Sequence, residues 1–249
     1  MTKLIKEGGN IWPDQTKNFD HTMIPGMMKQ INSVARQTGA KVLPIGSGAT
    51  PVPGKISGDL DMIVDAGVLK KYFKIDPADK NANKNVKIEF EKLFQQAGFE
   101  TRKTGQIVHV KVPMGDHAHQ VDIMVVDDGA AAQKFHVHDI PANSPYKGVH
   151  KQIAMAYLSK AAGMKWSPYK GLVNRDTNEL VSNNLDEIAK RILNPNASAK
   201  DLGSLESIMA ALKPDAAQQM LTDLKANNPA QFSQTESQEL NRIKQLSGL

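Results

Sequence analysis

The chain has 249 residues, of which 40% are hydrophobic and 23% are charged, proportions that are ordinary for a globular protein. No apolar run approaches the length of a membrane span, and the N-terminus lacks the apolar core of a signal peptide, so we expect a cytoplasmic protein with no membrane partner. The absence of cysteine excludes disulfides and thiolate metal sites, and the net charge of +5 suits a nucleotide or another polyanionic partner.

The spacing of apolar residues predicts a series of helices and strands that follows a mixed, polar extension over residues 1–22. In chain order these are a helix over 24–38, strands over 41–45 and 59–64, a helix over 86–97, two or three strands within 99–126, a turn at 127–129, a helix over 145–162, a short hairpin of 167–173 and 179–181, and short helices over 204–213, 215–226 and 235–246. Helices and strands alternate along the first part of the chain, which favours the α/β class.

Three aspartates lie in apolar, strand-like runs. Asp59 and Asp61 are separated by one residue, so the two-residue period of a strand places both carboxylates on one face. Two such charges on a half-buried strand repel and are costly to desolvate, and a divalent cation such as Mg²⁺ or Mn²⁺ relieves both effects. Asp122 has apolar neighbours on both sides and can complete the site from another strand. The competing candidates for this third position are Asp65, Asp127 and Asp128.

A loop rich in small residues precedes the acidic strand. Gly46 and Ser47 end the predicted first strand, where glycine lets backbone N–H groups approach a triphosphate and the serine hydroxyl can donate to a phosphate oxygen. The alternative is a plain turn between strand and loop. Lys55 in the same loop can neutralise phosphate charge, although most loop lysines are only solvated.

This region resembles the signature of the DNA polymerase β-type nucleotidyltransferase superfamily. The shared pattern is an apolar residue, Gly46-Ser47, a loop, and then Asp59-Leu60-Asp61-Met62. The stretch Ser57-Gly58-Asp59-Leu60-Asp61 is also similar to the family X polymerases, whose common form is Ser-Gly-Asp-Met-Asp. A weaker likeness to the family X thumb spans residues 162–173 and 185–188. The resemblance as a whole covers residues 25 to 195.

The resemblance implies an α/β fold in which a mixed β-sheet flanked by helices forms a nucleotidyltransferase palm, followed by a helical, thumb-like C-terminal part. The implied divisions are an N-terminal extension of residues 1–22, a palm domain of 23–140, a thumb-like subdomain of 141–195 and a C-terminal helical segment of 196–249.

The implied reaction moves a nucleoside monophosphate from an NTP or dNTP to an acceptor hydroxyl and releases pyrophosphate. Asp59 and Asp61 would hold both Mg²⁺ ions, and Asp122 would bind the catalytic ion and help to draw the proton from the acceptor. The resemblance also implies triphosphate contacts at Ser57 and Gly58 and an aromatic contact to the sugar at Tyr146. The sequence departs from the pattern of the family X polymerases at two places. Ala49-Thr50-Pro51 stands where that family usually has an arginine, and Asn143-Ser144-Pro145 stands where it has Thr-Gly-Ser.

Charge provides the sequence evidence on the acceptor. The segment 147–170 contains no acidic residue, and Lys147, Lys151 and Lys165 are candidates for a phosphate-backbone track, with a solvated helix face as the alternative. The basic charge favours a nucleic-acid 3′ end, as in a small family X-like polymerase or terminal transferase. The alternatives are transfer to a protein, a tRNA or a small molecule such as an antibiotic, and an inactive nucleotide- or nucleic-acid-binding module.

Overall fold

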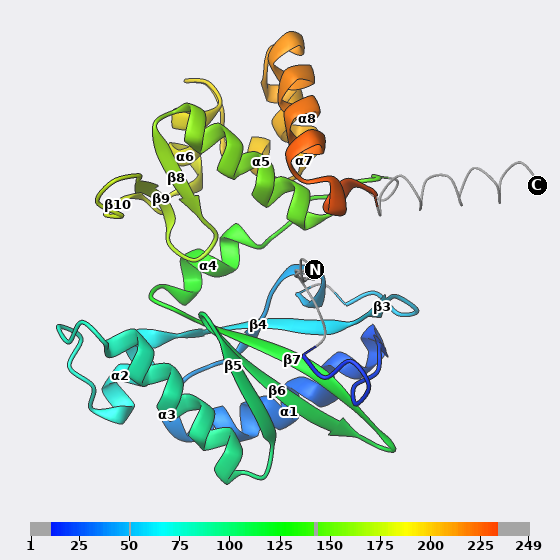
Figure 1. Ribbon diagram of the computed structural model, residues 1–249, viewed down its shortest axis with the longest axis vertical. Coiled ribbons are helices and arrows are strands. Elements are labelled where there is room, and N and C mark those ends of the chain that lie inside the picture. The colour runs from blue at the N-terminus through cyan, green and yellow to red at the C-terminus, as the bar shows by residue number, and fades with distance from the viewer. Residues whose placement is uncertain (1–10, 50, 142–143, 234–249) are drawn as a thin grey trace, which may run out of the picture. The chain divides into compact units, whose positions relative to one another are not determined.

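A computed structural model describes residues 11–49, 51–141 and 144–233, and the chain divides into two compact units, the first ending at Gln133 and the second beginning at Lys134. Each unit combines helices with a β-sheet (Figure 1), so the predicted α/β class is confirmed. Within the described ranges, no helix has both the length and the apolar character needed to cross a bilayer.

The first unit is built on a five-stranded mixed sheet in the order β2-β4-β7-β6-β5. Its strands are β2 (Leu43–Pro44), β4 (Asp59–Asp65), β5 (Glu100–Thr104), β6 (Ile107–Met114) and β7 (His117–Val126). Strands β4 and β7 run parallel, and all other neighbours are antiparallel. This sheet is the mixed sheet expected from the sequence, with two strands far apart in the chain as central neighbours.

Helices cover one face of this sheet. Both α1 (Ile24–Ala35) and α3 (Ala82–Gln96) contact β6, and α2 (Ala66–Phe73) packs on α3 (Figure 1). The core side chains of the central strands are Leu60, Met62, Val64, Val108, Val110, Val112, Val121, Ile123 and Val125. Because side chains alternate along a strand, the residues between them occupy the opposite face.

The segment before α1 is joined to the sheet. The backbone N–H of Lys17 donates to the carbonyl of Ala118 at 2.9 Å, and Trp12 is buried with its ring 5.2 Å from the guanidinium of Arg102. Further along, β1 (Phe19–Asp20) pairs with β3 (Ile56–Ser57), and a 3₁₀ turn, η1 (His21–Met23), leads into α1. The first 3₁₀ turns after α1 are η2 (Arg36–Thr38) and η3 (Gly46–Gly48).

The second unit has a small antiparallel sheet in the order β10-β9-β8, made of β8 (Met164–Ser167), β9 (Gly171–Asn174) and β10 (Leu180–Ser182). Its helical elements are α5 (Gly148–Ala161), α6 (Leu185–Ile192), η4 (Ala199–Leu202), α7 (Leu205–Ala211) and α8 (Pro214–Asn227). Helix α5 contacts β8, α7 and α8. The side chain of Asn184 begins α6 by accepting the backbone N–H groups of Asp186 and Glu187.

Several elements differ from those that the sequence predicts. The predicted strand over 41–45 is only two residues long, and the predicted hairpin of the second unit contains a third strand at Met164–Ser167. The predicted turn at 127–129 leads directly into a helix, α4 (Gly129–Phe135), and neither α4 nor α2 was predicted. The predicted helix over 235–246 lies outside the described residues.

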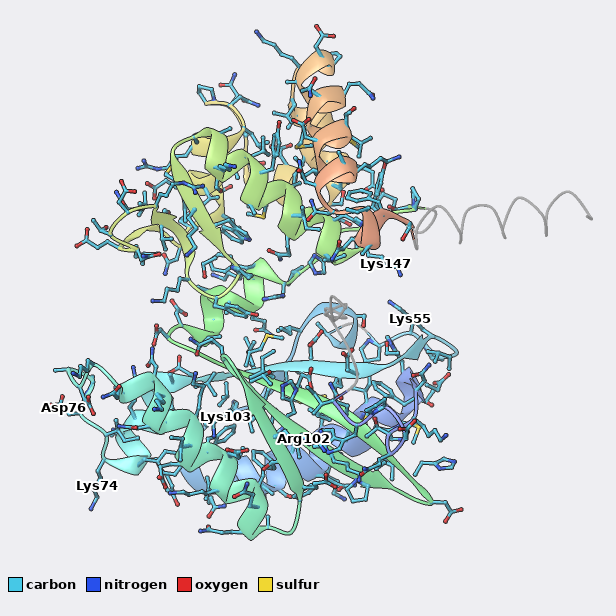
Figure 2. All side chains as sticks on the ribbon, viewed as in Figure 1. Lys55, Lys74, Asp76, Arg102, Lys103 and Lys147 are labelled. Carbon is cyan, nitrogen blue, oxygen red and sulfur yellow. The ribbon has the colours of Figure 1, made fainter. Side chains whose placement is uncertain are left out.

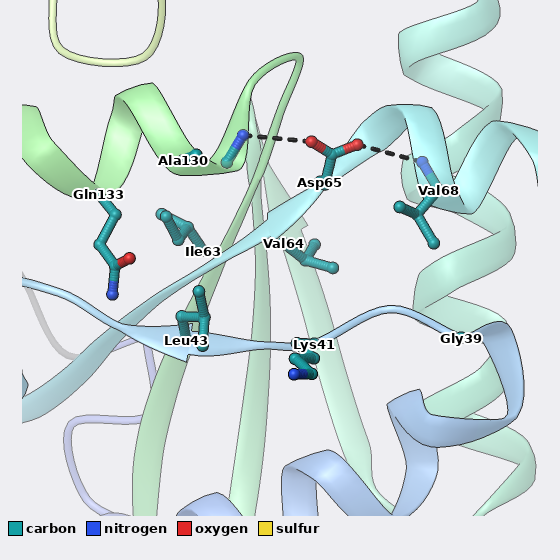
Figure 3. Close-up of a pocket in the computed structure, with 10 residues that line it drawn as sticks. Gly39, Lys41, Leu43, Ile63, Val64, Asp65, Val68, Ala130 and Gln133 are labelled. Carbon is teal, nitrogen blue, oxygen red and sulfur yellow. Dashed lines mark hydrogen bonds between the residues drawn. The ribbon is translucent and has the colours of Figure 1, made fainter.

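One side chain contacts the first turns of both unpredicted helices. The carboxylate of Asp65, at the end of β4, accepts the backbone N–H of Val68 at 3.1 Å and that of Gly129 at 3.2 Å (Figure 3). These bonds satisfy otherwise unpaired N–H groups in the first turns of α2 and α4. Asp65 therefore serves the fold as a cap for two helices that are distant in sequence.

Candidate active site

The structure brings the three predicted carboxylates to one face of the central sheet. In the parallel register of β4 and β7, Asp61 lies opposite Asp122 and Asp59 lies opposite Gln120. These residues alternate with the core residues of the same strands, so their side chains occupy the face opposite the helices. Asp59 and Asp61 are half-buried, and Asp122 is 7% exposed.

Mutual repulsion and burial perturb this cluster. Burial raises the pKa of Asp61 to about 7, and the charges of Asp59 and Asp122 contribute to the same shift. Burial, followed by the charge of Asp122, also raises the pKa of Asp59. Near neutral pH the protein therefore retains a proton on this cluster for part of the time.

Asp122 is held in place by a chain of hydrogen bonds. Nδ1 of His109 lies 2.8 Å from Oδ1 of Asp122, and Nε2 of Gln120 donates to Oδ1 and Oδ2 at 3.0 and 3.2 Å. The hydroxyl of Thr104 lies 2.6 Å from Nε2 of His109, and the amide oxygen of Gln120 accepts the backbone N–H of Ile11 at 2.7 Å. Both neighbours of Asp122 are thus fixed by a further contact, which orients its carboxylate.

His109 and Gln120 were not predicted as site residues. Each is a polar residue next to buried apolar residues of a strand, which is the available sequence signal. That signal does not identify a partner, because it is the antiparallel register of β6 and β7 that sets His109 opposite Asp122. The neighbouring carboxylates that competed for the third position have other contacts: Asp65 caps two helices, and Asp127 lies 3.6 Å from Nζ of Lys70.

The donor set fits a hard divalent cation. Three carboxylates on one face offer the oxygen ligands that Mg²⁺ prefers, and two of them have pKa values raised by burial and by the negative charge of their neighbours. Within the described part of the chain, however, no three acidic or histidine side chains are already gathered as a metal-binding group. Binding of an ion therefore requires Asp59 and Asp61 to converge on Asp122 and the cluster to release its proton.

The predicted phosphate loop lies next to the acidic strand. The backbone N–H of Ile45 donates to the carbonyl of Asp61 at 3.0 Å, which sets the following turn, η3, beside β4. Gly46 begins this turn with φ of +55°, in the left-handed region that favours glycine, and Ser47 is exposed. Gly48 is packed so closely that an added Cβ would lie 2.5 Å from Leu60.

The other predicted residues of this loop lie between η3 and β4. Lys55 and Gly58 are exposed, and the side chain of Lys55 is seen beside β3 (Figure 2). Ser57 is half-buried in β3, and its hydroxyl lies 2.8 Å from Nε2 of His21. The structure thus gathers the predicted phosphate-binding residues along the connection that leads into the acidic strand, and their contact with nucleotide stays a prediction.

The remaining predicted residues belong to the second unit. The ring of Tyr146 packs edge-on against His150, with ring centroids 5.6 Å apart. Lys147 is exposed directly before α5 (Figure 2), and Lys165 is exposed in β8, where its ammonium donates to the side chain of Asn178 at 3.2 Å. The roles predicted for these residues at the sugar and at a nucleic acid stay predictions.

Lys151 requires a correction. The side chain is 2% exposed, and Nζ donates to the carbonyls of Phe135 at 3.3 Å and Val137 at 2.7 Å. Burial lowers its pKa to about 8. A buried ammonium that bonds two carbonyls of its own unit cannot lie on an exposed phosphate track, so the predicted track is reduced to Lys147 and Lys165.

A cavity of about 330 Å³ opens elsewhere in the first unit, between β2, β4 and the starts of α2 and α4 (Figure 3). Its lining includes Lys41, Leu43, Val68 and Gln133 as well as Asp65. None of the three carboxylates of the candidate site lines it, and Asp65 is engaged in capping. We therefore assign this cavity no part in the chemistry of the acidic face.

Neither a protein-family model nor a curated protein matches the sequence. Among solved structures, the chain is similar to Leishmania infantum polymerase beta in a ternary P/T complex, at 15% identity and a TM-score of 0.45, with 75% of this chain and 72% of that chain covered. The ternary gap complex of the same protein matches at 14% identity and a TM-score of 0.44, covering 75% of this chain and 66% of that chain. Likenesses this distant do not assign an activity to the chain.

Proposed function

We propose that this protein is a metal-dependent nucleotidyltransferase that moves a nucleoside monophosphate from an NTP or dNTP to an acceptor hydroxyl. The observation that carries the proposal is the parallel register of β4 and β7, which sets Asp61 opposite Asp122 and places Asp59 on the same face. The raised pKa values of Asp59 and Asp61 mean that their ionised forms destabilise the fold. A cluster that opposes folding in this way is typical of a functional site.

The chemistry is an in-line displacement at the α-phosphorus. The acceptor oxygen forms a bond to this phosphorus, the bond from phosphorus to the bridging oxygen breaks, and pyrophosphate leaves. Mg²⁺ held by Asp59, Asp61 and Asp122 would neutralise charge on the phosphates and lower the pKa of the attacking hydroxyl. Asp122 takes the proton of that hydroxyl, and its contacts with His109 and Gln120 keep the carboxylate in a single orientation.

The loop beside the acidic strand supplies the contacts to the triphosphate in this proposal. Gly46 and Ser47 present the backbone and a hydroxyl next to Asp61, while Ser57 and Gly58 precede Asp59 directly. Lys55 adds a positive charge that stands exposed on the same loop. A triphosphate is recognised by N–H and O–H donors together with positive charge, and this loop offers all three.

We further propose that the acceptor is the 3′ end of a nucleic acid. The support is the net charge of +5 and the exposure of two of the predicted lysines of the second unit, Lys147 and Lys165. Transfer to a protein, a tRNA or a small molecule such as an antibiotic uses the same three carboxylates, so these acceptors are the alternative outcomes of the test. An inactive binding module is the remaining alternative.

The test is incubation of the protein with labelled ATP, GTP, CTP, UTP and the corresponding dNTPs, in Mg²⁺ or Mn²⁺, together with DNA, RNA or protein acceptors. We expect label transfer and pyrophosphate release that require the metal ion and that Asp61→Asn abolishes. Asp116→Asn is the matched control, because this carboxylate lies on an exposed turn of the same unit. Label on a protein or small molecule alone would reassign the acceptor. Metal-dependent binding of nucleotide without any turnover would point to the binding module.

A further inference from the structure

One buried histidine joins three parts of the proposed phosphate loop. The backbone N–H of His21 donates to the carbonyl of Lys55 at 3.0 Å, and its Nδ1 lies 3.2 Å from the backbone N of Val52. Its Nε2 lies 2.8 Å from the hydroxyl oxygen of Ser57. The side chain is fully buried, and its ring stacks on Phe19 with centroids 6.4 Å apart. Three bonds from one residue fix this loop against the segment that precedes α1.

These contacts determine the direction of the bond to Ser57. Burial, and then the charge of Lys55, lower the pKa of His21, so the ring is neutral at pH 7 and carries one N–H. The backbone N–H of Val52 can only donate, and Nδ1 must therefore be the acceptor. The proton lies on Nε2, which donates to the hydroxyl oxygen of Ser57.

A serine that accepts from histidine has its own hydroxyl hydrogen left to donate. Within the described part of the chain, that hydrogen has no protein acceptor, because the bond to His21 is the hydroxyl's one contact there. A hydroxyl that already accepts a hydrogen bond is polarised and donates more strongly. An anion next to Ser57 would meet a hydroxyl arranged to donate, on a loop that also carries the charge of Lys55.

We propose that His21 is a positioning residue that holds the Ser57 hydroxyl as a donor to a phosphate oxygen of the bound nucleotide. This inference rests on the proposed function and adds a determinant of nucleotide affinity from a part of the chain outside the acidic motif. His21 acts through Ser57 and through the loop, and it does not touch the nucleotide itself.

The test is a double-mutant cycle on the affinity for a non-hydrolysable ATP analogue with Mg²⁺, measured by calorimetric titration. His21→Phe keeps the ring volume and removes both side-chain bonds, and Ser57→Ala removes the hydroxyl. Loss of a hydrogen bond to a charged group weakens binding by about tenfold to a hundredfold, so we expect each single variant to weaken binding at least tenfold. The double variant should bind no more weakly than the weaker single variant.

His119→Phe is the matched control. His119 is also buried and packs edge-on against Phe19 at 5.5 Å, but its Nδ1 contacts the carbonyl of Lys17 and it makes no bond to the loop. This variant should unfold more easily while its nucleotide affinity stays at the wild-type value. His21→Gln provides a conservative variant, because its amide N–H can still donate to Ser57, and we expect it to retain most of the affinity.

The outcomes separate this inference from the proposed function. If the wild type binds no nucleotide, both fall. If the wild type binds but the effects of His21→Phe and Ser57→Ala multiply in the double variant, His21 acts on the fold alone and only this inference falls. A ¹⁵N spectrum of the His21 ring provides a readout that needs no nucleotide: we expect the Nε2–H form, and the Nδ1–H form would overturn the proposed direction of the bond.

Discussion

Replacing Asp61 with asparagine should stabilise the metal-free protein, and the gain should grow with pH. The carboxyl of Asp61 has a pKa of about 7 in the folded protein, against an ordinary value of 3.8. Because the folded value is the higher one, the folded state keeps a proton that the unfolded state releases. The stability contributed by the neutral form is present at low pH and is lost as the pH rises to about 7.

The size of the effect follows from the two pKa values. One pKa unit corresponds to about 1.4 kcal/mol, so ionising Asp61 costs the folded protein at most about 4 kcal/mol. Water at this half-buried site screens the repulsion, and we therefore expect Asp61→Asn to raise the free energy of unfolding by about 1 to 3 kcal/mol at pH 8. The difference between the two proteins should narrow towards pH 5, where wild-type Asp61 is largely protonated.

The assay is urea unfolding in EDTA at pH 5 and pH 8, followed by tryptophan fluorescence. Trp12 lies in the first unit and Trp166 in the second, so a Trp166→Phe background makes the signal report the unit that contains Asp61. Asp116→Asn, on an exposed turn, should change the stability by less than about 0.5 kcal/mol at either pH. Equal stability of wild type and Asp61→Asn at pH 8 would refute the reasoning.

Three further predictions follow from the site and the second unit. Saturating Mg²⁺ should raise the wild-type Tm more at pH 8 than at pH 6, because the ion competes with the proton on Asp61, and a shift independent of pH would contradict this. Gly46→Val should impair both folding and nucleotide affinity, because φ of +55° is strained for a β-branched residue. Asparagine tolerates this backbone conformation, so Gly46→Asn should lower mainly the nucleotide affinity measured by calorimetry. Unchanged affinity in Gly46→Asn would show that the triphosphate does not bind at this turn. Lys147→Ala and Lys165→Ala should each reduce the slope of log oligonucleotide affinity against log salt by about 0.7 to 0.9, while Lys151→Ala should lower stability in urea and leave the slope unchanged. A reduced slope in Lys151→Ala, together with an unchanged slope in Lys147→Ala and Lys165→Ala, would contradict the burial of Lys151.

The sequence by itself determined the local arrangement of the acidic strand. Alternation of apolar and acidic residues from Asp59 onward requires a strand with both carboxylates on one face, because strand side chains repeat with period two. The apolar spacing of α1 and the chain break at Gly39 were equally predictable, although α1 ends at Ala35 and Gly39 closes the following turn, η2. Its φ of +73° lies in the left-handed region that favours glycine. These features depend only on neighbours in the chain.

Tertiary structure decided which strands and side chains meet. The sequence offered Asp122 on its pattern alone, but the register that sets it opposite Asp61, and His109 opposite it, exists only once β4, β6 and β7 are paired. The amide of Gln120 faces Asp122 because its oxygen accepts a backbone N–H from the segment before α1. The alternating pattern of a strand predicts which of its residues share a face, but it does not predict which strand lies next to it.

Burial on helix α5 was likewise decided by packing. The lysine-rich segment predicts an exposed track, and Lys147 and Lys165 are indeed exposed, yet Lys151 is enclosed because α5 is covered by β8, α7 and α8 and because two carbonyls accept its ammonium. A helix packed on several sides has few exposed positions, and their identity depends on its neighbours rather than on its own composition. The sequence could predict the chemistry of each side chain, whereas its surroundings were fixed by contacts between elements distant in the chain.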